Sequence, residues 1–87
     1  MNWENIGFIK ASSHRINILT SLLKKEQTPR ELQDSVKIHF SQVSLILKEL
    51  MEKGLVECLN EDSRKGKIYS LTQSGEEAIK YILEGKK

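Results

Sequence analysis

Residues 41–53 carry the feature that most constrains the fold, a run whose apolar side chains recur with the period of an α-helix. At about 100° per residue, a single stripe of that helix is apolar, which predicts a face buried in a core. The stripe consists of Val43, Ile46, Leu47 and Leu50. Gly54 then supplies the left-handed residue that ends many helices. The run therefore predicts a helix with one side in the core and the other side open.

The open side of this helix is small and polar near its start. It carries Ser41, Ser44, Leu45 and Lys48. At 1.5 Å per residue the helix would be about 20 Å long, enough to lie in a DNA major groove about 12 Å wide. An ordinary solvated helix has the same pattern, so the neighbouring segments must decide between the two.

Length and charge allow a single small domain. The 87 residues leave room for one domain, residues 1–87, with a small core. The 14 Lys and Arg against 12 Asp and Glu give a net charge of +2, which is too mild to indicate nucleic-acid binding by itself. No apolar run approaches the roughly 20 residues of a membrane span, and no signal peptide is apparent. We expect a cytoplasmic protein without membrane contact.

The chain offers little for catalysis or metal binding. A single cysteine excludes an internal disulfide framework, and two histidines beside it argue against zinc. No nucleophile stands with a base, and no phosphate-cradling loop is present. We therefore predict no enzyme activity, no catalytic residue, no metal and no cofactor. Cys58 is alone on a strand-like run, and both a packed residue and a redox-sensing thiol remain open.

The segments before residue 28 predict two apolar elements. Residues 1–11 form an N-terminal arm or short helix that packs on the domain's own core or on a second copy, through Trp3, Ile6, Phe8 and Ile9. Residues 12–24 form a helix capped by Ser12 or Ser13. Its apolar stripe is wide enough for burial on two sides and contains Ile16, Ile18, Leu19, Leu22 and Leu23. We expect His14 and Arg15 in its first turn to be solvated.

Thr28, Pro29 and Glu31 together predict a sharp helix start. Thr28 can cap, proline suits the first helical position, and Glu31 can close a capping box. This helix must be short because residues 38–40 have to turn before the next helix begins. Two helices joined by such a turn, with the longer one second, fit the helix-turn-helix pattern.

The residues after Gly54 predict an antiparallel hairpin and a last helix. Residues 55–59 and 67–71 are strand-like runs around a polar loop. Positive charges gather at its far side, on Arg64, Lys65 and Lys67. Thr72 can cap a C-terminal helix over residues 72–84, which we expect to return apolar side chains to the core: Ala78, Ile79, Ile82 and Leu83. The fold class is mainly α with a small antiparallel β-hairpin.

This order of elements resembles a winged helix-turn-helix domain. Over residues 16–83 the chain is similar to small transcriptional regulators of the MarR/ArsR type, including compact archaeal members. The motifs that carry the resemblance are Thr28-Pro29-x-Glu31-Leu32, Ser41-x-Val43-Ser44-x-x-Leu47-x-x-Leu50-x-x-x-Gly54-Leu55-Val56 and Arg64-Lys65-Gly66-x-x-Tyr69-x-Leu71-Thr72-x-x-Gly75.

The resemblance implies how such a domain would meet DNA. The second helix of the motif would enter the major groove, and the hairpin of residues 55–71, the wing, would reach the backbone or minor groove with its basic tip, residues 60–67. The resemblance makes a groove-facing set of Ser41, Gln42, Ser44, Leu45 and Lys48. The implied wing contacts are Arg64, Lys65 and Lys67.

Three positions depart from the family pattern. Lys37 stands where relatives often have glycine, because that turn tends to need a positive φ. His39 stands where relatives tend to have a Ser or Thr cap. Leu45 is apolar at a position that is often basic or polar, and it could meet a thymine methyl or a protein partner.

Two functions remain open at this point. The first is sequence-specific binding of double-stranded DNA by a transcriptional regulator, with a homodimer on a palindromic site. The dimer would use the apolar surface of residues 1–11, 12–24 and 72–84. The alternative is a winged-helix module for protein–protein interaction without sequence-specific DNA binding.

Overall fold

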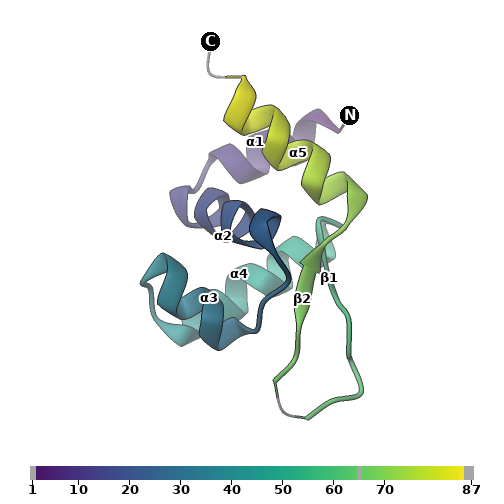
Figure 1. The fold of residues 1–87 in the computed structure, drawn as a ribbon. Coiled ribbons are helices and arrows are strands. Elements are labelled where there is room, and N and C mark those ends of the chain that lie inside the picture. Colours follow the sequence, from purple (N-terminus) through teal and green to yellow (C-terminus); the bar gives the residue numbers. More distant parts are fainter. Residues whose placement is uncertain (1, 65, 86–87) are drawn as a thin grey trace.

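The computed structural model describes residues 2–64 and 66–85, which form helices and one hairpin in the predicted class (Figure 1). The elements in chain order are α1 (Trp3–Lys10), α2 (Ser13–Lys24), α3 (Pro29–Val36), α4 (Phe40–Glu52), β1 (Val56–Cys58), β2 (Tyr69–Leu71) and α5 (Gln73–Glu84). Helices α1 and α5 lie at one end of the domain, and α3, α4 and the wing lie at the other.

The N-terminal segment is a helix rather than an extended arm. Asn2 caps it, since its side-chain oxygen accepts hydrogen bonds from the N–H groups of Glu4 and Asn5 at 2.9 and 3.2 Å. Ile6 and Ile9 are buried in the chain's own core, whereas Trp3 is 64% exposed. The segment therefore packs mainly on its own domain and leaves one aromatic side chain outside.

Helix α2 lies at the centre of the described fold. It contacts α1, α3, α4, α5 and β2, which explains why its apolar stripe is wide. Ser12, rather than Ser13, caps it by accepting the N–H of Arg15 at 3.4 Å. Ile18 and Leu19 are fully buried. The domain itself covers most of this stripe, which confirms the expected burial on two sides.

The wing is confirmed as an antiparallel hairpin, with Val56 opposite Leu71. Its strands are shorter than the predicted runs 55–59 and 67–71. A third backbone segment joins it, because Gln27 and Tyr69 exchange N–H to carbonyl hydrogen bonds at 3.0 and 2.8 Å. This pairing ties the α2–α3 connection to the wing.

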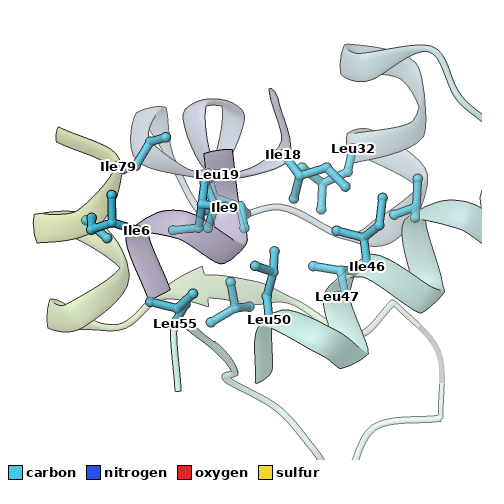
Figure 2. Close-up of a cluster of buried hydrophobic side chains, with 14 residues drawn as sticks. Ile6, Ile9, Ile18, Leu19, Leu32, Ile46, Leu47, Leu50, Leu55 and Ile79 are labelled. Atoms are coloured by element: carbon cyan, nitrogen blue, oxygen red, sulfur yellow. The ribbon is translucent and has the colours of Figure 1, made fainter. Parts of the chain in front are cut away.

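One apolar cluster holds the helices and the root of the wing together (Figure 2). The inner stripe of α4 is buried as predicted. Ala78 and Ile79 of α5 are buried, but Leu83 is 38% exposed, so its expected return to the core was wrong. Ile82 in the same last turn is partly buried against the core, so Leu83, about 100° further round the helix, lies on a more exposed side. The buried apolar side chains are Ile6, Ile9, Ile18, Leu19, Leu22, Leu32, Val43, Ile46, Leu47, Leu50, Leu55, Val56, Ala78 and Ile79.

Candidate nucleic-acid interface

The start of α3 is fixed by the predicted capping box. The Glu31 N–H donates to Thr28 Oγ1 at 3.2 Å, and the Thr28 N–H donates to Glu31 Oε1 at 2.9 Å. Pro29 occupies the first helical position. Each partner satisfies an N–H group that a helix start otherwise leaves open. The helix-turn-helix therefore begins at a defined residue.

The turn between α3 and α4 has a positive φ at Lys37, as expected for a position where relatives often have glycine. Lys37 ends α3 with a φ of 58°, in the left-handed region. Its N–H donates to the Gln33 carbonyl at 2.8 Å. A side chain in this region crowds its own carbonyl, which glycine would avoid. The chain therefore makes the tight turn with a strained residue.

The start of α4 lacks a side-chain cap in the described part of the chain, as expected from a histidine where relatives tend to have Ser or Thr. His39 is the N-cap residue with extended backbone, and its side chain makes no capping hydrogen bond within the described residues. The helix begins at Phe40, one residue before the predicted start. Its first N–H groups thus lack the oxygen that a Ser or Thr would place there.

Four of the five predicted groove-facing residues share the outer face of α4, and Gln42 lies at the edge of that face, in a hollow that it shares with Lys37 and His39. All are exposed: Ser41, Gln42, Ser44, Leu45 and Lys48. Leu45 is 57% exposed, so this face mixes hydrogen-bonding groups, one cation and one large apolar side chain. Such a face can contact phosphates, base edges and thymine methyl groups.

Asn60 shapes the tip of the wing. Its Oδ1 accepts the Ile68 N–H at 2.7 Å, and its Nδ2 donates to the Gly66 carbonyl at 3.3 Å. Because a side chain takes the place of a strand carbonyl, the ladder ends near Cys58, which explains the short strands. Gly66 has a φ of 60°, the left-handed conformation that glycine adopts without strain.

The structure describes two of the three predicted wing cations. Arg64 and Lys67 are exposed on the wing, whereas Lys65 lies outside the described residues. Glu61 and Asp62 are exposed on the same tip, so the tip carries both signs of charge.

A groove lies where the start of α3, the start of α4 and the wing meet; we call it the wing groove. It is lined by Thr28, Pro29, Arg30, Phe40, Arg64, Gly66, Lys67 and Tyr69. The sequence prediction missed Arg30 and Phe40. Phe40 is 46% exposed, and a large aromatic residue in a turn gives no sequence signal of whether it faces core or solvent.

Tyr69 lines the wing groove as a neutral phenol. Burial raises its pKa above the ordinary value, and the nearby Cys58 and Glu61 raise it further. The phenol therefore keeps its proton at physiological pH and adds no negative charge to the groove.

Arg15 is not solvated, contrary to the prediction. Its guanidinium donates to the Phe8 carbonyl at 2.7 Å, stacks on the Phe8 ring at 3.7 Å from its centroid, and pairs with Glu49 at 3.4 Å. Through Arg15, these contacts join Phe8 of α1 to Glu49 of α4. Amphipathic spacing alone could not place the three partners together.

Two further properties concern residues 2–64 and 66–85. No group of three or more His, Cys, Asp or Glu side chains is arranged to hold a metal ion there. Over the same residues, no helix has the length and apolar character needed to cross a membrane.

Solved structures share this arrangement. The chain superposes on a cysteine-to-serine mutant of MarR from E. coli with a TM-score of 0.75 and 25% identity, over 86% of this chain and 58% of MarR. For the transcriptional repressor BigR from Xylella fastidiosa, the TM-score is 0.79 and the identity 23%, over 93% of this chain and 79% of BigR. This chain has a winged helix-turn-helix fold.

A MarR family regulator from Neisseria meningitidis, NMB1585, gives a TM-score of 0.77 at 23% identity, over 94% of this chain and 59% of that protein. The winged-helix chain thus spans less than two thirds of MarR and of NMB1585. No protein-family model and no curated protein sequence matches it. The neighbours agree with the MarR part of the resemblance at the level of the fold, while the ArsR and archaeal parts rest on the sequence motifs alone.

Proposed function

We propose that this chain is a transcriptional regulator that binds double-stranded DNA sequence-specifically. Helix α4 would lie in the major groove, and the wing tip would contact the backbone or minor groove. A regulator that acts on genomic DNA works inside the cell, and the proposal includes a cytoplasmic location. The likeness to MarR and to the repressor BigR supports this function.

One observation carries the proposal. Five exposed side chains lie on the outer face of α4 and its edge, and the exposed cations Arg64 and Lys67 lie on the wing of the same end of the domain. Hydrogen-bonding groups on a helix that fits the major groove can read base edges, and flanking cations can neutralise phosphates. The net charge of only +2 is compatible with this, because DNA binding needs cations on the contacting surface rather than a large excess over the whole chain.

Selection of bound sequences from a random duplex pool tests the proposal. We expect an enriched motif, and a palindrome with half-sites about one helical turn apart would indicate a dimer. Lys48→Ala combined with Arg64→Ala should lower affinity and the salt slope, since each phosphate contact contributes about 0.9 to that slope. An unenriched pool, or no binding to any duplex at low ionic strength, would contradict the proposal.

We also propose a homodimer through the end of the domain opposite the wing. Trp3 is 64% exposed and packs edge-on against Tyr81, whose ring centroid is 5.4 Å away. Tyr81 and Leu83 are also exposed, at 42% and 38%. Sedimentation at micromolar concentration should give twice the monomer mass, and Trp3→Ala should shift the equilibrium toward monomer. A wild-type protein that sediments as a monomer at high micromolar concentration would refute the dimer.

The alternative, a protein-interaction module, is favoured by one specific feature. Leu45 and Phe40 place two large apolar side chains, 57% and 46% exposed, on or beside the outer face of α4. Chemical-shift mapping with duplex DNA separates the two functions. Perturbations on Ser41 to Lys48 that grow as salt is lowered support DNA binding, and an unperturbed face supports the protein module.

A further inference from the structure

Gln27 lies in the connection between α2 and α3, and among the described residues it is the one polar residue that is buried, with 5% of its surface exposed. The connection, residues 25–28, supplies no side chain to the apolar cluster or to the apolar residues packed against it. A buried amide is costly unless its hydrogen bonds are made. The connection is therefore held by polar contacts, and those of the Gln27 amide are the buried ones.

The amide of Gln27 caps the end of α2 and reaches α3. Its Nε2 donates to the Ser21 carbonyl at 2.7 Å and to the Lys25 carbonyl at 3.3 Å, and it lies 2.9 Å from Ser21 Oγ. Ser21 is in the last turn of α2, where a helix leaves its carbonyls without backbone partners. The Ser35 hydroxyl, in the last turn of α3, donates to Gln27 Oε1 at 3.5 Å. One side chain thus joins the ends of two helices.

The backbone of Gln27 holds the wing. It exchanges N–H to carbonyl hydrogen bonds with Tyr69 of β2 at 3.0 and 2.8 Å. Strand β2 leads back from the tip that carries Arg64 and Lys67. Because the side chain is fixed to α2 and α3 while the backbone is fixed to β2, a displacement of Gln27 would move these cations relative to α4.

We propose that Gln27 is a positioning residue, whose buried amide fixes the angle of the wing relative to α4. This rests on the proposed function, in which α4 and the wing bind one duplex together, and it extends that function to a residue behind the interface. With the amide in place, both surfaces meet the duplex at once. Without the amide, α4 still enters the major groove, but the wing cations no longer lie beside phosphates.

Residual dipolar couplings of backbone N–H bonds, measured by NMR on the free protein, test the angle directly. Gln27→Met keeps a side chain of similar length and removes the amide, while the backbone can still pair with Tyr69. In this variant, the couplings of Leu59 and Ile68 in the wing should no longer fit the wild-type orientation relative to α4. Gln73→Met is the matched control, because it makes the same substitution at an exposed position of α5. It should leave the wing couplings unchanged.

The salt dependence of duplex binding tests the consequence for DNA. In the wild-type background, Arg64→Gln and Lys48→Gln should each lower the salt slope by about 0.9. In the Gln27→Met background, Lys48→Gln should keep this effect and Arg64→Gln should lose it. A merely structural role would lower the folded fraction, which weakens binding at every salt concentration but leaves both slope changes as they are. Slope changes that are equal in the two backgrounds would therefore overturn the positioning role.

Ser21→Ala is a milder change to the same network. It removes only the hydroxyl beside the amide, at a helical position where alanine is well tolerated. It should shift the wing couplings in the same direction as Gln27→Met, and it replaces that variant if circular dichroism shows Gln27→Met to be unfolded. Wild-type couplings in the folded variant would overturn the proposal. A wild-type chain that binds no duplex would overturn the proposed function, whereas the couplings would still decide whether Gln27 sets the angle of the wing.

Discussion

Gly75 lies in the first turn of α5, and it is the described glycine at which an added Cβ would come closest to other backbone atoms. A Cβ atom at this position would lie 1.9 Å from the carbonyl oxygen of Leu55 and 2.9 Å from its carbonyl carbon. Both atoms belong to the backbone, so neither can rotate away. In the Gly75→Ala variant, the start of α5 must therefore separate from Leu55.

The size of that separation sets the energetic effect. Real Cβ contacts are essentially never shorter than 3.0 Å, so the shift from 1.9 Å is at least 1.1 Å. Two hydrogen bonds hold this junction: the Thr72 N–H donates to the Leu55 carbonyl at 3.1 Å, and the Thr72 hydroxyl donates to the Gly54 carbonyl at 2.7 Å. Overpacking costs about 1–3 kcal/mol, and each weakened hydrogen bond about 1 kcal/mol.

The gain in helix propensity from alanine, about 1 kcal/mol, offsets part of this. We expect Gly75→Ala to destabilise the domain by about 3 kcal/mol. For a domain of this size, 1 kcal/mol corresponds to roughly 4–8 °C, so Tm should fall by about 12–24 °C.

Gly7→Ala is the matched control for thermal unfolding followed by circular dichroism. Gly7 is also a helical glycine, but a Cβ there meets nothing within 4 Å. Its replacement should raise stability by roughly 0.5–1 kcal/mol, through helix propensity alone. If both variants raise Tm, the close approach of α5 to Leu55 is wrong.

Three other variants each test a single local feature. Lys37→Gly should stabilise the domain by roughly 0.5–1 kcal/mol, since glycine adopts the left-handed turn without strain; a denaturant midpoint that does not rise would contradict this. Arg15→Met should lower stability by about 1–2 kcal/mol through loss of the Phe8 hydrogen bond, and thermal unfolding beside Lys10→Met as control checks it. Asn60→Ala should speed amide hydrogen exchange at Ile68 more than in the core, and equal protection in variant and wild type would show that Asn60 does not shape the wing.

The predictable parts of the fold are those that depend on residues close together in the sequence. The capping box of Thr28 needs partners only three residues apart, and the inner stripe of α4 repeats within a few turns, so both followed from the sequence. The strained turn at Lys37 was expected from the resemblance, because relatives often have glycine there, and its φ of 58° agrees.

The features that were missed depend on side chains that meet across the fold. Arg15 and Glu49 are 34 residues apart in the chain, and Gln27 pairs with Tyr69 of the wing. Periodicity assigns each of these residues to an element without giving the distance between elements. Phe40 was missed for the same reason, because its exposure depends on where the wing lies relative to α4.

The two ends of the domain are linked by α2 and by Arg15. Trp3 and Tyr81 lie at the end proposed for the dimer, while the outer face of α4 and the wing lie at the other (Figure 1). A dimer formed at the first end leaves both copies of α4 free for DNA. Arg15 contacts the Phe8 carbonyl of α1 and Glu49 of α4, and Glu49 directly follows Lys48, which we propose to face DNA. Because helices move as stiff units, the position of α1 in a dimer would constrain the angle at which α4 meets the major groove.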